Sequence, residues 1–402
     1  MCESYYLSPF ATISPEKSGF KLGSLLEPKE SMYINSLTEL INMSKDNLEW
    51  LFVHKKKINQ YKNRAFYILE KTFENQVDTV GYVETTARCP YHCQICPKSN
   101  QKQRRVSWEL SLSDLDNLLS QISKAKKLTF HVFGDPLLDK NIFEKISLAN
   151  RYGIKPSFST NLISLLNLEL FKFNNIKLSN LTISFDSLES MKLSEIRGGI
   201  SKEHLEKSID CLIELGEQAL KIKNIETIYL QRIDLKNNQE DEQKLKFLAN
   251  KNPLFHYVKK KFITFPTVNS SLSTVEKIEF GETTLLYRAL KAKLPFQCLK
   301  PWFKNETCIL SDGSYSPCCM LLNDEFQLGN LKSKTMSDYF SSRSHGNFRK
   351  NIFNSSIGGM CQKCRILKNR VQLPDEISEF DIKILRKFCL SDWETINEKN
   401  SI

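Results

Sequence analysis

Short apolar stretches rich in β-branched residues alternate, in the middle of this chain, with longer segments of helical periodicity. The stretches predict six strands, at residues 81–87, 128–133, 156–160, 181–186, 225–231 and 256–264. Between them, apolar residues recur at helical spacing, most clearly over 114–127, where Ser111 or Ser113 is expected to act as N-cap, and over 202–221. Strands that alternate with helices at this spacing form βαβ units around a parallel sheet.

The predicted α/β core runs from about residue 80 to about residue 265 and contains too few strands to close an eight-stranded barrel. A partial (β/α)6 barrel, or an open sheet, is therefore expected. In such folds the active residues lie at the carboxyl ends of the parallel strands. Candidate chemistry should consequently follow the strands directly in the sequence.

The two ends of the chain have different patterns from the core. Strand-like pieces (FATIS, GFKLGSLL and SMYINS) precede helical stretches near 37–54 and 61–76, which indicates a small α+β appendage of β3α3 order. From about residue 295 the chain is rich in Cys, Gly, Ser and Asn, as in a loop-rich domain held together by a metal or cluster. The predicted domains are 1–80, 81–290 and 291–402, the last with a helical tail.

Composition places the chain among ordinary globular proteins. It has 402 residues, of which 41% are hydrophobic and 26% charged, and a net charge of +11. The excess lysines are scattered, which is typical of a solvated surface, although a basic surface could steer an acidic substrate or leader peptide. We find no nucleic-acid module, no apolar run long enough to span a membrane and no secretory signal, so a cytoplasmic location is expected.

Twelve cysteines change this picture, because a large chain in a reducing compartment has little use for disulfides. Three of them, Cys89, Cys93 and Cys96, follow the first predicted strand at a C-x3-C-x2-C spacing. Three thiolates can bind one face of an iron–sulfur cluster and leave the fourth iron open to another ligand. A zinc site that pairs Cys93 and Cys96 with Cys361 and Cys364 is the alternative, but it leaves Cys89 unexplained.

This triad, with the motifs that follow the next three strands, resembles the radical S-adenosylmethionine superfamily. There a [4Fe–4S] cluster with an open iron binds S-adenosylmethionine and cleaves it to a 5′-deoxyadenosyl radical, which takes hydrogen from a substrate. HVFGDPLLD resembles the Gly-Glu-Pro turn that receives the methionine amino group, with Asp in place of Glu. STN and ISFDSLES resemble the segments around the ribose and carboxylate. The resemblance gives cofactor contacts to Gly134, Asp135, Pro136, Ser159, Thr160, Asn161, Ser184, Asp186 and Arg197.

The C-terminal cysteines resemble those of SPASM/twitch domains, which carry auxiliary clusters. The resemblance assigns Cys298, Cys318, Cys361 and Cys364 to one auxiliary [4Fe–4S] cluster, with Cys308 and Cys319 as alternates. Such a cluster has no open iron and is suited to electron transfer. Gly313 is expected to turn a β-hairpin that delivers Cys318, and a short helix is expected at MSDYF.

Other reactive residues carry weaker signals. Cys2, Cys211 and Cys389 are isolated and are interpreted as ordinary small apolar side chains. His92 and His131 could act as an acid or base, but local hydrogen bonding is the commoner role of such residues. The sequence identifies no general base for a substrate.

An auxiliary cluster implies that an electron leaves the substrate, as in a dehydrogenation or cross-link. The first expected substrate is a ribosomally made peptide, because residues 5–78 have the β3α3 order of leader-binding winged helices, in which an edge strand pairs with the leader. The second is an aminocyclitol or sugar, as in twitch-domain dehydrogenases. A non-catalytic iron–sulfur redox protein is the alternative of another class. Flavodoxin or ferredoxin is the expected electron donor, and neither nucleic acid nor membrane is an expected partner.

Overall fold

The computed structural model describes most of the chain from residue 5 to residue 353. The described residues are 5–7, 11–16, 19–24, 30–36, 39, 43, 52–54, 66–71, 74, 76–91, 93, 96, 98, 108–122, 124–125, 127–167, 169–235, 238, 240–261, 298, 300–319, 321 and 328–353. They fall into two compact units. One unit groups Met1–Gln76 with Glu282–Trp302 and Asn347–Ile402, and the other groups Val77–Gly281 with Phe303–Gly346.

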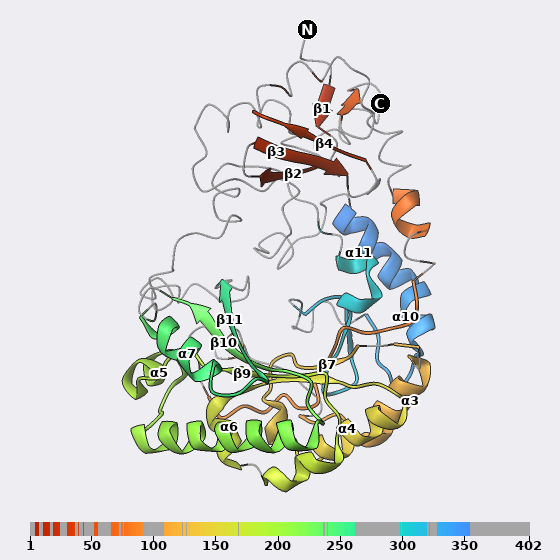
Figure 1. Cartoon of the computed structure of the whole chain (residues 1–402). Coiled ribbons are helices and arrows are strands. Elements are labelled where there is room, and N and C mark those ends of the chain that lie inside the picture. Colours follow the sequence, from red (N-terminus) through yellow and green to blue (C-terminus); the bar gives the residue numbers. More distant parts are fainter. Residues whose placement is uncertain are drawn as a thin grey trace. The chain divides into compact units, whose positions relative to one another are not determined.

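The second unit is built on an eight-stranded, mostly parallel sheet, which confirms the predicted α/β class (Figure 1). Its strands in spatial order are β11 (Phe255–Lys261), β10 (Ile228–Asp234), β9 (Asn180–Ser184), β8 (Ser157–Asn161), β7 (Thr129–Phe130), β6 (Tyr82–Val83), β12 (Cys308–Ile309) and β13 (Tyr315–Ser316). Six of them, from β6 to β11, coincide with the six strands predicted from the apolar stretches. The order follows the chain from β6 to β11, as successive βαβ units require.

One face of this sheet is apolar and fully covered. Side chains at one level of the register pack together across the strands and are at most 5% exposed: Val83, Phe130, Phe158, Leu181, Ile228 and Phe255. Helices of this unit lie against the apolar face (Figure 1). They and the short 3-10 turns are α3 (Leu112–Gln121), η4 (Pro136–Leu138), α4 (Ile142–Arg151), η5 (Leu162–Asn167), η6 (Leu170–Asn175), α5 (Ser190–Arg197), α6 (Lys202–Ile222) and α7 (Asp241–Ala249). Ser111, one of the two predicted caps, accepts a hydrogen bond from the backbone N–H of Asp114 at the start of α3.

The opposite face of the sheet is polar. Successive side chains of a strand point to opposite faces, so the residue after each apolar position belongs to this second face. Five of these residues keep some exposed surface: His131, Ser159, Thr182, Tyr229 and His256. The sixth, Glu84, is 1% exposed. We call this side the polar face; it is where the strand ends of a partial barrel present their chemistry.

The β12–β13 hairpin extends the barrel sheet beyond its first strand. β12 pairs in parallel with β6 and antiparallel with β13, in the register Cys308 to Tyr82 and Cys308 to Ser316. Gly313 has a φ of +84°, in the left-handed region that glycine tolerates, and its N–H donates to Leu310 O at 2.9 Å. The predicted turn is thus confirmed, and so is the predicted short helix, which is α10 (Met336–Ser341). The η9 turn (Lys304–Glu306) precedes the hairpin.

The first unit contains two small sheets. One has three antiparallel strands in the order β2 (Ala11–Glu16), β3 (Gly19–Ser24) and β4 (Ser31–Ile34), which match the three predicted pieces. The other pairs β1 (Tyr5–Leu7) with β5 (Phe52–His54). The helical prediction near 37–54 is therefore wrong at its end. Phe52 and Val53 have high strand propensity, and pairing with a distant strand outweighed the local helical pattern.

A buried ion-pair cluster holds distant segments of the first unit together. Arg349, on α11 (Arg343–Phe353), donates to Glu70 at 2.7 Å, and the indole of Trp302 donates to the same carboxylate at 2.9 Å. Trp302 is the last residue of the η8 turn (Lys300–Trp302) and is 1% exposed.

Among the described helices, none combines the length and apolar character that crossing a bilayer requires.

Candidate active site

The cysteine triad lies in the loop that leaves the carboxyl end of β6, as predicted. Cys93 is buried, whereas Cys89 and Cys96 are partly exposed. The loop is fixed from within, because the backbone N–H of Cys96 donates to Cys93 O at 3.0 Å and Lys98 Nζ donates to Cys89 O at 3.4 Å. The three thiols therefore belong to one short, internally bonded turn at the mouth of the sheet.

The electrostatics of the triad favour a bound cation. Burial raises the pKa of all three thiols, and each thiol raises the pKa of another, which means that the three lie within electrostatic reach of one another. A thiolate in such a place needs a positive partner, and iron supplies one. Among the described residues, no three Cys, His, Asp or Glu side chains converge closely enough to hold a single metal ion. A cluster, whose thiolates bind different irons, accepts the wider spacing.

The turn after β7 closes onto the start of the triad loop. A Cβ on Gly134 would lie 1.8 Å from the backbone oxygen of Thr86 and 3.0 Å from that of Arg88. Next to it, the N–H of Asp135 donates to Arg88 O at 2.7 Å. The predicted Gly134-Asp135-Pro136 motif is therefore in direct backbone contact with the residue that precedes Cys89.

Asp135 is the centre of a buried hydrogen-bond network. Its side chain is almost fully enclosed, and its two carboxylate oxygens accept from five donors of three segments. These are Leu137 N at 3.1 Å, Thr160 Oγ1 at 2.6 Å, Asn161 N at 3.1 Å, Ser164 Oγ at 2.8 Å and Asn161 Nδ2. Burial raises the pKa of this carboxyl, and the hydrogen bonds from Thr160, Asn161 and Ser164 act in the opposite direction.

The residues of the two predicted cofactor motifs after β8 and β9, STN and ISFDSLES, differ in whether they belong to this network. Thr160 and Asn161 are committed to Asp135, so they brace the turn against the end of β8. Ser159, in the middle of β8, and Ser184, the last residue of β9, are partly exposed. Of these residues, the two serines are the ones that present free surface to a ligand.

Exchanging Asp135 for asparagine is expected to weaken the barrel. The amide keeps the size of the side chain but replaces acceptor capacity with an N–H2 group that faces other donors. An unsatisfied buried donor costs about 1–3 kcal/mol, so we expect the urea midpoint of the apoprotein to fall accordingly. Asp116→Asn is the matched control, because Asp116 is exposed and accepts one bond, from Tyr152 Oη at 2.9 Å. Equal midpoints for the two variants would contradict the network.

Asp186 and Arg197 form a buried ion pair beside the triad. Arg197 donates from Nε and Nη2 to one Asp186 oxygen, at 2.8 and 2.5 Å, and the other oxygen accepts from Ile233 N at 2.8 Å. Burial alone would lower the pKa of Arg197, but Asp186 and the thiols of Cys93 and Cys96 raise it above its ordinary value. The backbone oxygen of Arg197 lies 3.7 Å from Cys93 Sγ. The end of β9 and helix α5 thereby place a permanent positive charge next to the triad.

Sequence reasoning missed two residues that position the path from β6 to the triad loop, Lys145 and Glu84. Lys145 on α4 is fully buried and donates to Asp139 at 2.5 Å and to Thr85 O, on the first strand's extension, at 3.3 Å. Glu84, the residue after β6, accepts from the N–H of Ser311 at 3.0 Å. A charged residue at an apolar helix position was the available signal for Lys145; nothing in the sequence pairs Glu84 with residue 311.

The described cysteines of the C-terminal region lie in different surroundings. Cys318 is buried two residues after β13, and Cys298 is partly exposed. Cys308 is fully buried beside Phe133 and Leu310, in an apolar cluster against which Cys319 packs. The remaining predicted ligands, Cys361 and Cys364, lie outside the described residues, as does His92 of the triad loop. The hairpin therefore delivers Cys318, while its partners stay predictions.

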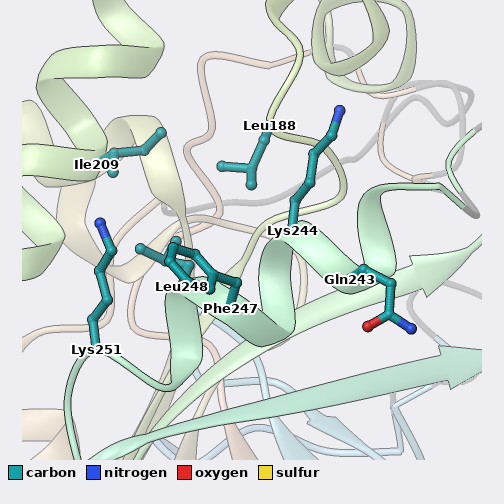
Figure 2. Close-up of a pocket in the computed structure, with 7 residues that line it drawn as sticks. All are labelled: Leu188, Ile209, Gln243, Lys244, Phe247, Leu248 and Lys251. Carbon is teal, nitrogen blue, oxygen red and sulfur yellow. The ribbon is translucent and has the colours of Figure 1, made fainter.

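A separate groove lies on the helical side of the second unit (Figure 2). It has a volume of about 500 Å³ and shares no residue with the polar face. Its lining comes from α6, α7 and the segment before α5: Leu188, Ile209, Gln243, Lys244, Phe247, Leu248 and Lys251. The groove contains no residue of the triad and none of the nine predicted cofactor positions, so we do not assign the chemistry to it.

Comparison with protein families decides the class of the protein. Residues 83–229 match the family model of the radical SAM superfamily, and this span contains the triad and all nine predicted cofactor positions. The chain is a member of the radical SAM superfamily. Residues 298–365 match the SPASM model, an iron–sulfur cluster-binding domain. The family implies a [4Fe–4S] cluster and S-adenosylmethionine, and the SPASM domain implies auxiliary iron–sulfur clusters.

Solved structures of low sequence identity resemble this radical SAM chain. SuiB of Streptococcus suis bound to S-adenosylmethionine is 15% identical, with a TM-score of 0.49, over 86% of this chain and 90% of that chain. anSMEcpe with bound AdoMet and Cp18Cys peptide is 16% identical, with a TM-score of 0.45, over 76% and 94%. BtrN in complex with AdoMet and 2-DOIA is 16% identical, with a TM-score of 0.39, over 73% and 95%. No curated protein matches the chain.

Proposed function

We propose that this radical SAM protein is a peptide maturase that oxidises a ribosomally made peptide, by dehydrogenation or by forming a cross-link. The proposal has three parts: a catalytic cluster on Cys89, Cys93 and Cys96, a cofactor site along the ends of β7 to β9, and a peptide-binding edge in the first unit. When bound, the cluster would supply the electron that cleaves S-adenosylmethionine to methionine and a 5′-deoxyadenosyl radical, and this radical would take a hydrogen atom from the peptide.

The observation that carries the choice of a peptide is strand β4. It pairs with β3 on one side and has no second strand partner among the described residues, so its other edge can hydrogen-bond an extended chain. Tyr33 in this strand is 67% exposed, while Leu22 and Ile34 of the same sheet are buried. An anchored edge strand with an exposed aromatic side chain suits binding by strand addition.

The chain's own residues have distinct tasks in this scheme. The Gly134–Asp135 turn and its network hold the ends of β7 and β8 in place, Ser159 and Ser184 face the cofactor, and Arg197 offers a cation to its carboxylate. A substrate must then lie on the polar face, where the covered sheet excludes bulk water from one side. Positioning matters because a primary carbon radical attacks whatever C–H bond is nearest.

Oxidation requires that the substrate also lose a second electron and a proton. We assign the electron to one auxiliary cluster on Cys298, Cys318, Cys361 and Cys364, a set of four thiolates that would leave no open iron. A flavodoxin or ferredoxin would supply the electron that starts each turnover. This part rests on the SPASM match over residues 298–365.

A peptide-binding experiment tests the substrate class. Fluorescein-labelled precursor peptides encoded beside the gene are titrated with the reconstituted protein, and binding is followed by anisotropy. We expect Tyr33→Ala to weaken binding at least tenfold, because an anchoring aromatic contributes on the order of 2 kcal/mol. Phe171→Ala is the control, since Phe171 is 62% exposed on η6, outside the β4 edge. If the protein releases 5′-deoxyadenosine in the presence of an aminocyclitol but not in the presence of any of the peptides, the substrate is a small molecule and the peptide proposal is wrong.

Iron analysis tests the two clusters independently of any substrate. After anaerobic reconstitution, the intact chain is expected to hold about eight irons and eight sulfides, and the Cys89/Cys93/Cys96→Ala variant about four of each. Cys211→Ala is the control, because Cys211 on α6 is expected to bind no iron. About four irons in the intact chain and none in the triple variant would show that the protein has no auxiliary cluster. Stoichiometric zinc without sulfide would contradict the radical chemistry.

A further inference from the structure

The side-chain amide of Gln231 lies on the polar face of the barrel sheet. Gln231 is the fourth residue of β10. Its neighbour Arg232 is fully buried on the helical side, where it donates to Tyr257 Oη at 3.0 Å and to Glu242 of α7 at 3.1 Å. Because successive side chains of a strand alternate, Gln231 belongs to the opposite face, as Tyr229 does two residues earlier.

The register of the sheet places this amide beside the predicted cofactor site. Gln231 pairs with Ser184 of β9, which in turn pairs with Asn161 of β8. Neighbouring strands lie about 4.8 Å apart, so Gln231 and Ser184 are next to each other on the polar face. Asn161 donates to Asp135, whose N–H is bonded to the residue before Cys89. Gln231 therefore lies at the level of the sheet that is bonded to the triad loop.

The amide of Gln231 is buried without a hydrogen bond. The residue is 9% exposed, and its carboxamide has no hydrogen-bond partner among the residues that the structure describes. The carboxamide of Asn238, buried in the turn after the same strand, makes four hydrogen bonds, with Arg232, Leu235 N, Asp186 O and Ile233 O. Burial of an amide without hydrogen bonds costs free energy, so a buried amide of this kind calls for a partner that the fold does not supply.

The chemistry of the amide and its surroundings favours a peptide group as that partner. A carboxamide has two N–H donors and an acceptor in one plane, and a peptide group offers the matching acceptor and donor. The residues beside Gln231 in the register, Ser184 and Val258, carry no charge, which suits a neutral ligand. Two residues earlier along the strands, the rings of Tyr229 and His256 are in contact, with centroids 6.2 Å apart. This aromatic surface suits a side chain of the same peptide.

We propose that Gln231 holds a peptide group of the substrate on the polar face, next to the cofactor site, through paired hydrogen bonds to its carboxamide. The inference rests on the proposed function, because only a peptide substrate brings such a group. Gln231 is then a substrate-positioning residue that fixes which C–H bond faces the 5′-deoxyadenosyl radical. Position is decisive at this step, because a displacement of about 1 Å can cost about two orders of magnitude in rate.

The stability of the apoprotein separates this role from a structural one. Gln231→Met keeps the length of the side chain and removes an amide that bonds no described residue, so the urea midpoint should not fall. Asn238→Leu is the matched control, because its amide makes the four hydrogen bonds given above and its midpoint should fall. Equal losses in the two variants would make the Gln231 amide part of the fold and overturn the inference.

Binding of S-adenosylmethionine separates a substrate contact from a cofactor contact. Calorimetric titration of the reconstituted Gln231→Met variant should give the affinity of the native protein within about twofold, because the amide is assigned to the substrate. A loss of about tenfold or more would assign the amide to the cofactor and overturn the inference.

The origin of the hydrogen in 5′-deoxyadenosine reports the position of the substrate. A precursor peptide is prepared with deuterium on its carbon atoms, and the share of 5′-deoxyadenosine that carries deuterium is measured by mass spectrometry. We expect this share to fall by a factor of about three or more in Gln231→Met, while the total 5′-deoxyadenosine stays within about twofold, because the radical forms but the C–H bond is misplaced. Gln243→Met makes the same exchange at an exposed glutamine of α7 and should behave as the native protein.

Failure of the inference differs from failure of the proposed function. An unchanged deuterium share in Gln231→Met would overturn the inference and leave the proposed function standing, because the native protein would still take hydrogen from the peptide. If the native protein itself transfers no deuterium from any of the precursor peptides, the proposed function is wrong and the inference falls with it.

Discussion

Replacing Gly134 with alanine is expected to abolish cluster binding by the triad and to destabilise the barrel. The new Cβ would lie 1.8 Å from Thr86 O, which is a backbone atom between β6 and the triad loop and cannot turn aside as a side chain can. Overpacking typically costs 1–3 kcal/mol, and we expect about 3 kcal/mol because backbone must move. Urea unfolding of the apoprotein measures the cost, and iron content after reconstitution measures the loss of the triad.

A second glycine provides the control for this substitution. A Cβ on Gly346, within helix α11, meets nothing within 4 Å. Alanine is favoured over glycine inside a helix by up to about 1 kcal/mol, so Gly346→Ala should be neutral or stabilising. Full iron content in Gly134→Ala, at unchanged stability, would show that the turn after β7 does not constrain the triad loop.

Replacing Lys145 with methionine is expected to have the largest effect on stability. Lys145 and Asp139 are both fully buried with their charged atoms 2.5 Å apart, and the ammonium also donates to Thr85 O. Removing one partner of a buried pair leaves an uncompensated charge, which costs about 3–5 kcal/mol. Because Thr85 lies on the path from β6 to Cys89, we also expect less iron on the triad.

Two further variants separate charge from packing at this pair. Lys145→Met/Asp139→Asn removes both charges and should recover at least half of the lost stability. Lys155→Met breaks a pair with Glu226 in which both side chains are more than half exposed, and it should cost at most about 1 kcal/mol. Equal losses for Lys145→Met and Lys155→Met, or no recovery in the double variant, would contradict a buried-charge mechanism.

The sequence by itself predicted most of the architecture that carries the site. Each of the strands β6 to β11 is a short apolar, β-branched stretch, and the helices α3 and α6 have clear periodicity, so local pattern alone located them. The triad was visible because its three cysteines follow one strand at a fixed spacing. Local signals of this kind depend only on residues close together in the chain.

Tertiary structure decided whatever depended on residues far apart in the chain. Pairing of residues 52–54 with 5–7 replaced a helical pattern by a strand. The carboxylate of Asp135 accepts hydrogen bonds from Thr160, Asn161 and Ser164, and no pattern in the sequence indicates these partners. In both cases the interaction partner lies far away in the sequence and becomes a neighbour only when the chain folds, so a local pattern does not indicate it.

The face to which a charged side chain points was decided in the same way. Lys259 and Lys260 are adjacent and identical in sequence, yet one pairs with Glu242 and the other lies on the polar face. The strand's alternation and the position of α7 separate them, and neither is written in the residues themselves. The sequence therefore determined which chemistry the chain carries, and the tertiary structure decided which groups remain free to perform it, because burial and partners are set only when the sheet is assembled.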